Sequence, residues 1–148
     1  MTTTDHTTPL ADQLLTQPTF DRLVADSQTL VASELKKKNM ALRGAFNMIQ
    51  KAKPDLIARS LRALMPEFVA ALEPFYAEAQ ANGQSLGTRL KAHDEQAADA
   101  LLAVSDRRVD DVDNRVIKSG YQRLRGRAHK EVVAAMPGLA ALLDKHTA

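Results

Sequence analysis

The pattern in this sequence that most resembles reaction chemistry is an acidic stripe between residues 95 and 113. Five carboxylates fall within about 80° of arc on an ideal helix. Oxygen ligands of this kind hold Mg²⁺, so a magnesium-dependent hydrolase centred on Asp99, Asp106 and Asp110 is one hypothesis. A magnesium cage, however, needs carboxylates that converge from more than one element, and here the apolar residues lie opposite. We therefore expect a solvated face. The acidic stripe consists of Glu95, Asp99, Asp106, Asp110 and Asp113.

Other catalytic and metal-binding patterns are missing. The sequence has no cysteine, which excludes a thiolate metal site, a cysteine nucleophile and a disulfide. It also lacks a glycine-rich phosphate loop and a Gly-x-Ser-x-Gly nucleophile motif. No histidine has zinc or di-iron spacing: we expect His93 and His129 on helix surfaces, and His6 and His146 in frayed ends. We therefore predict no catalytic residue, no metal ligand and no cofactor.

Clusters of basic side chains are a stronger indication of a binding site. The formal net charge is only +2, but the segments 36–62 and 115–130 hold most of the twenty Lys and Arg residues. Such a face could remain solvated or pair with the acidic stripe, within the chain or in a neighbour. It could also bind a protein partner, or bind nucleic acid weakly and without sequence preference. The candidate basic face consists of Lys36, Lys37, Lys38, Arg43, Arg115, Lys118, Arg123, Arg125 and Arg127.

The elements that carry these residues should all be helices, because Ala, Leu, Lys, Arg and Gln dominate and alternating strand patterns are absent. An apolar stripe follows Thr19, a plausible N-cap, and includes Leu30, Val31 and Leu35. Predicted helices cover about 10–16, 20–38, 40–52 and 54–82. Ser85, Asp94 and Asn114 then open further helices, while Pro66 and Pro74 predict kinks or restarts and Pro137 an interruption.

An internal duplication is the most specific feature of the chain. Residues 41–50 align with 116–125, and nine of the ten aligned positions keep their chemical class. Further along, 64–72 aligns with 135–143. The predicted fold is thus all-α, a single-domain bundle of about seven or eight short helices with pseudo-two-fold symmetry, whose halves are about 10–83 and 84–146.

The chain resembles a family of small, all-helical bacterial proteins of unknown function over nearly its whole length after Leu10. In this sequence Phe46 stands where a tyrosine is expected in the first copy. The resemblance implies a compact helical cytoplasmic protein, and it implies no reaction. It rests on Leu42, Arg43, Phe46, Pro54, Leu72 to Tyr76, Ala100 to Leu102, Lys118, Tyr121 and Val132 to Pro137.

Composition supports the same class. The 148 residues are 45% hydrophobic and 26% charged, which suits one domain, and no apolar run could span a membrane. Residues 1–9 lack the features of a secretory signal, so we expect a disordered N-terminal tail ahead of one helical domain over 10–146, in the cytoplasm. The leading functional hypothesis is a non-enzymatic protein-interaction or structural module that binds a partner or forms a homodimer. The alternative is the nucleic-acid binder.

Overall fold

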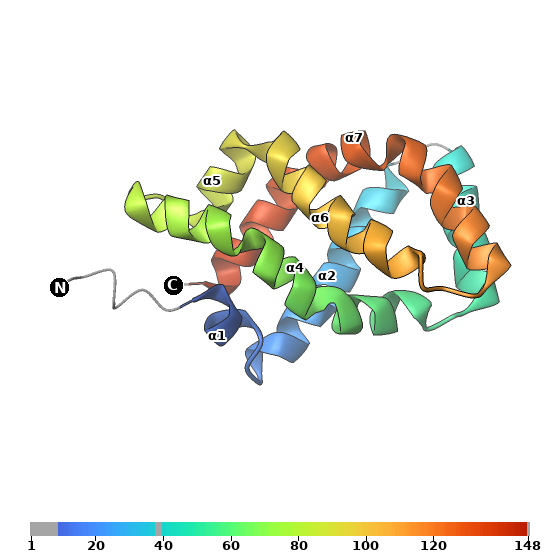
Figure 1. The fold of residues 1–148 in the computed structure, drawn as a ribbon, viewed down its shortest axis with the longest axis horizontal. Helices are drawn as coiled ribbons and strands as arrows, with labels where there is room; N and C mark the ends of the chain where they lie inside the picture. Colours follow the sequence, from blue (N-terminus) through green and yellow to red (C-terminus); the bar gives the residue numbers. More distant parts are fainter. Residues whose placement is uncertain (1–8, 38–39, 148) are drawn as a thin grey trace.

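A computed structural model describes residues 9–37 and 40–147. Within these residues it contains helices and no strand, which confirms the predicted all-α class (Figure 1). The helices are α1 (Leu10–Leu14), α2 (Thr19–Lys36), α3 (Met40–Ala52), α4 (Leu56–Ala81), α5 (Leu86–Ala92), α6 (Asp94–Val109) and α7 (Arg115–His146). Residues 1–8 of the predicted tail lie outside the described residues, as does Lys38 of the basic face.

Side-chain caps begin two of the helices as the sequence predicts. The hydroxyl of Ser85 accepts a hydrogen bond from the backbone N–H of Thr88 at 3.1 Å, at the start of α5. The Asn114 side chain accepts from Val116 N at 2.9 Å and from Ile117 N at 3.2 Å, which starts α7. Thr19 was the wrong choice of cap, because the residue that flanks α2 is Pro18.

Prolines do not divide the long helices. We expected restarts at Pro66 and Pro74 and an interruption at Pro137, but α4 and α7 run through all three. Each proline is exposed, whereas neighbouring Met65 and Met136 are buried in the core. Packing on the core side therefore holds each helix together across the missing backbone hydrogen bond. Figure 1 shows α7 curving strongly along its length.

Two short helices complete the core at the end of the molecule near the C-terminus. Helix α1 packs on α4 through Leu10 and Leu14, and α5 packs on α7 through Leu86 and Leu90. All four leucines are at most 1% exposed. Among the described residues, no helix is both long enough and apolar enough to cross a membrane.

Carboxylates from the long helices satisfy the first backbone N–H groups of these short helices. Glu73 of α4 accepts from the N–H groups of Leu10 and Ala11 at 3.0 Å each. Asp144 of α7 accepts from Gly87 N at 2.8 Å. Glu73 and Asp144 occupy corresponding positions when the predicted halves are aligned. The duplication itself stays a prediction.

Candidate functional site

Most of the basic face is exposed. Of its described members, Lys118 and Arg125 are half-buried and the others are exposed. Helix α3 packs against α7, so Arg43 and the basic residues in the first turns of α7 lie at the same end of the molecule (Figure 1). Lys37 is paired with Glu34 at 3.2 Å. The positive charge of this face is thus partly compensated within the chain.

Arg125 is held by the acidic stripe rather than presented to solvent alone. Its Nε donates to the two carboxylate oxygens of Asp106 at 2.9 and 3.2 Å, and the Tyr121 hydroxyl donates to the same carboxylate at 2.6 Å. Arg125, followed by Tyr121, lowers the pKa of Asp106. Burial and the bond to Asp106 raise the pKa of Tyr121 well above its usual value, so the phenol stays neutral. This cluster joins α6 to α7.

Asp106 of the acidic stripe is therefore paired within the chain, while its side chain stays 42% exposed. Asp99 also reaches α7, where its carboxylate lies 3.1 Å from His129 Nε2. The remaining members, Glu95, Asp110 and Asp113, are exposed. Across residues 9–37 and 40–147 no group of three or more His, Asp or Glu side chains could hold a metal ion. The three carboxylates of the hydrolase hypothesis thus form no cage in this part of the chain.

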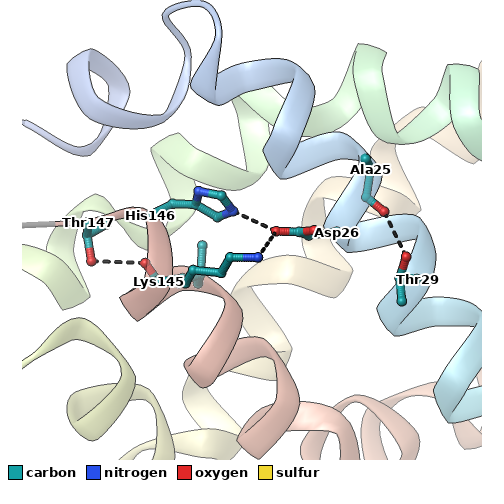
Figure 2. Close-up of polar contacts among 7 residues, drawn as sticks. Ala25, Asp26, Thr29, Lys145, His146 and Thr147 are labelled. Atoms are coloured by element: carbon teal, nitrogen blue, oxygen red, sulfur yellow. Dashed lines mark hydrogen bonds and ion pairs between the residues drawn. The ribbon is translucent and has the colours of Figure 1, made fainter.

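The C-terminal end of α7 is anchored, which corrects the expectation that His146 lies in a frayed end. His146 Nε2 lies 2.7 Å from Asp26 Oδ2, and Lys145 Nζ lies 3.2 Å from the same oxygen (Figure 2). The His146 side chain is only 9% exposed. His146 and then Lys145 lower the pKa of Asp26. His6 falls outside the described residues.

Among the described residues, neither threonine hydroxyl near the Asp26–His146 pair donates to the imidazole. Figure 2 shows the two nearby threonines bonded to backbone carbonyls. Thr29 Oγ1 donates to the carbonyl oxygen of Ala25 at 3.2 Å, and Thr147 Oγ1 donates to that of Leu143 at 2.9 Å. A catalytic triad requires a hydroxyl that donates to the imidazole. The arrangement therefore fits a tether between α2 and the end of α7.

The strongest candidate for a binding site is apolar, and it lies between α2 and α7. A cavity of about 310 Å³, open to solvent, is lined by the second half of α2 and the middle of α7. Eight of its ten lining residues are aliphatic, and the two others are glutamates. Its lining consists of Leu30, Val31, Glu34, Leu35, Leu124, Ala128, Glu131, Val132, Ala135 and Leu139.

A second cavity of about 210 Å³ is lined by residues of α2, α4, α6 and α7. The two share four lining residues, Leu30, Val31, Val132 and Leu139. The second is otherwise lined by Leu23, Ser27, Leu61, Met65, Phe68, Val69, Leu72, Leu101, Leu102, Ser105 and Leu143. We call the two together the apolar cavity pair.

Sequence reasoning missed this hollow because it treated Leu30, Val31 and Leu35 simply as core. The available signal was the pair of small residues Ala128 and Ala135, which lie two turns apart on the face of α7 that meets α2. Small side chains do not always indicate a cavity, because they also occur where two helices pack closely. Gly138, one turn after Ala135 on α7, is such a close-packed position. A Cβ on Gly138 would lie 2.7 Å from Leu30 Cδ1.

Comparison with known proteins places the chain in a family. No curated protein and no solved structure matches it. A family model does match residues 10–147, which is nearly the whole chain. The chain therefore belongs to the family of unknown function DUF6918.

Proposed function

We propose that this chain is a non-enzymatic binding protein that holds a small apolar ligand in the apolar cavity pair. Small-molecule sites are typically concave and mostly apolar, and carry a few polar groups. Both concave surfaces at the junction of α2, α4, α6 and α7 open to solvent, so a ligand could enter them without unfolding of the protein.

The single observation that carries the proposal is the chemistry of the lining. Among the described lining residues, the polar side chains are Ser27 and Ser105 in the second cavity and Glu34 and Glu131 in the first. None of these described lining residues is a histidine, lysine or arginine. This composition supports burial of apolar surface without a reaction.

Fluorescence titration with N-phenyl-1-naphthylamine, a neutral apolar probe, tests the proposal. We expect saturable enhancement at about one probe per chain. Ala135→Leu places a larger side chain in the first cavity and should weaken probe binding at least about tenfold, because it fills the space. Ala134→Leu is the matched control, since Ala134 neighbours Ala135 on α7 but is exposed. It should bind the probe as the unmodified protein does.

Two results would contradict this function: no saturable enhancement, or an equal response from both alanine variants. Circular dichroism and thermal unfolding of each variant verify that it is folded. If the probe bound only a partly unfolded state, its fluorescence would increase in a destabilised variant. A folded Ala135→Leu protein with reduced probe fluorescence would therefore exclude that explanation.

The basic face supports a second candidate, binding of an anionic partner such as nucleic acid or an acidic protein. Its specific support is the packing of α3, which carries Arg43, on α7, which carries Arg123 and Arg127. Duplex DNA at low salt is the probe. Arg123→Glu with Arg127→Glu should abolish binding, whereas Arg22→Glu on α2 should reduce it little. Absence of binding at low salt removes nucleic acid as the partner.

A further inference from the structure

We propose that α7 docks against double-stranded DNA through one stripe of basic side chains, which contact phosphates without reading the base sequence. This inference goes beyond the apolar site. It rests on the second candidate function, and it names the partner and the residues that contact it. We call these residues the α7 basic stripe. The α7 basic stripe consists of Arg115, Ser119, Arg123, Gly126, Arg127 and Lys130.

The α7 basic stripe follows one side of the helix. On an ideal helix its six residues fall within about 120° of arc. Its four cations are exposed, and residues 115–130 include no acidic residue. Arg115 and Lys130 lie about 22 Å apart along the helix axis, because each residue adds about 1.5 Å. The stripe is therefore a long, narrow surface of a single charge sign.

The cations of this stripe are not compensated within the described part of the chain. Among the residues that the structure describes, none of the four forms an ion pair. Arg125 differs, although it lies on the same helix, because its Nε pairs with Asp106 at 2.9 Å. The structure thus removes Arg125 from the surface that the sequence indicated and adds Lys130.

The chemistry of the stripe favours a duplex over other anionic partners. Protein interfaces usually have a core that is poor in charge and rich in aromatic residues, and the stripe is the reverse. Single strands are commonly held by stacking on aromatic side chains, which the stripe also lacks. A duplex instead presents regularly spaced phosphates, which Arg and Lys can neutralise.

The dimensions of a helix favour DNA. An α-helix with its side chains is about 10–12 Å across, and the major groove of B-form DNA is about 12 Å wide. The major groove of an RNA duplex is deep and narrow, so side chains enter it poorly. We therefore place α7 along the major groove, with stripe cations beside the phosphates that border it.

Gly126 lies near the centre of the stripe and allows a close approach. A Cβ at Gly126 would meet nothing within 4 Å, so packing inside the described part of the chain does not require a glycine. Glycine also destabilises the interior of a helix relative to alanine. The missing side chain therefore matters most to a partner that lies directly against α7.

The salt dependence of binding tests the contact residues. Fluorescence anisotropy with a short labelled DNA duplex measures affinity over a series of salt concentrations. Four phosphate contacts predict a slope of about −3 to −4 for the logarithm of affinity against the logarithm of salt concentration. Arg127→Gln should make this slope shallower by about one. Arg22→Gln is the control and should keep the slope, because Arg22 is an exposed arginine of α2 outside the stripe.

A pair of glycine variants tests the close approach. Gly126→Leu should keep the thermal stability of the protein and weaken duplex binding at least about fivefold, because the added side chain lengthens the phosphate contacts beside it. Gly44→Leu is the control. Gly44 lies on α3 and is also exposed, and a Cβ there would likewise meet nothing within 4 Å. It should bind DNA as the unmodified protein does, and an equal loss from both variants would contradict the docking of α7.

Competition experiments test the choice of partner. Single-stranded DNA, an RNA duplex and polyglutamate should each displace the labelled duplex less effectively than unlabelled duplex DNA. Equal competition by any of the three would overturn the assignment to duplex DNA.

The outcomes separate this inference from the functions proposed above. If DNA binds but Arg127→Gln keeps the full salt slope, the second candidate function stands and the α7 basic stripe is not its surface. If no DNA binds at low salt, this inference fails together with nucleic acid as a partner. The apolar site is unaffected by either result, because its test is the binding of N-phenyl-1-naphthylamine.

Discussion

The helices pack tightly in one part of the molecule and leave an apolar cavity in another. At the packed end, Leu10, Leu14, Leu86 and Leu90 are at most 1% exposed. In the hollow middle, the apolar cavity pair opens to solvent between α2, α7 and their neighbours α4 and α6. Helices α1 and α5 are only five and seven residues long. Helices this short are not stable alone, so they depend on tight packing. Tight packing is therefore a requirement at the end that holds the short helices, whereas the long helices α2 and α7 can leave a concave surface between them.

The largest expected effect is on the free energy of unfolding, when one leucine is replaced by alanine in each region. Leu90→Ala at the packed end should lower the free energy of unfolding by about 2–5 kcal/mol, because it opens a new cavity. Leu35→Ala in the hollow middle removes a side chain that is only half-buried, so it loses less buried apolar surface and should cost about 1 kcal/mol. Urea denaturation measures both. Equal costs would mean that the two regions are packed alike.

Loss of an interhelical cap should have an intermediate effect. Asp144→Ala removes the acceptor for Gly87 N and leaves that N–H unsatisfied at the start of α5. We expect a loss of about 1–2 kcal/mol in the free energy of unfolding. Glu95→Ala, at an exposed position of α6, is the control and should change it little. A neutral Asp144→Ala variant would show that α5 needs no cap from α7.

Acid should weaken two ion pairs that hold α7 against its neighbours, His146 with Asp26 on α2 and Arg125 with Asp106 on α6. The pKa values of Asp26 and Asp106 are lowered in the folded protein, by His146 and Arg125 respectively. A lowered folded-state pKa contributes stability above the unfolded value near 3.8, and this stability is lost as pH falls through the folded-state value.

The matching measurement is urea denaturation of the unmodified protein and Asp106→Asn between neutral pH and pH of about 3. The variant should be less stable at neutral pH by at most about 1 kcal/mol, because Arg125 and Asp106 are both more than a third exposed. The difference should shrink on acidification. A difference that grows as pH falls would show that the sign of this account is wrong.

The smallest expected effect is a gain. Ala135→Leu fills part of the hollow middle and should raise the free energy of unfolding by about 0.5–1 kcal/mol in the absence of ligand. Ala134→Leu should leave it nearly unchanged, because that side chain is exposed. Thermal unfolding midpoints compare the two. A destabilised Ala135→Leu protein would mean that the first cavity has no room for the added atoms.

The helical class and the starts of α5 and α7 were predictable from the sequence, because Ser85 and Asn114 carry local capping information. The sequence did not predict that α4 and α7 are continuous. Their continuity depends on core packing around Met65 and Met136 rather than on the adjacent prolines. Propensity describes a residue and its near neighbours, and tertiary packing can override it.

The site was harder to predict than the fold. The residues of the basic face were identifiable as charges, but the sequence did not settle whether Arg125 would pair with Asp106 or remain in water. The apolar cavity pair could not be predicted from the sequence. Leu30 and Val132 are typical core residues, and their types do not show whether they pack against each other or line a cavity. A void depends on the distance between helices, which no local pattern encodes.

The most direct test of the central claim is to locate bound ligand by methyl nuclear magnetic resonance. During titration with N-phenyl-1-naphthylamine, we expect saturating shifts at the common walls of the cavity pair, Leu30, Val31, Val132 and Leu139. The methyl groups of Leu10 and Leu90 at the packed end should not move. Shifts at the packed end or only at exposed Val116, or no saturating shift at all, would contradict the account.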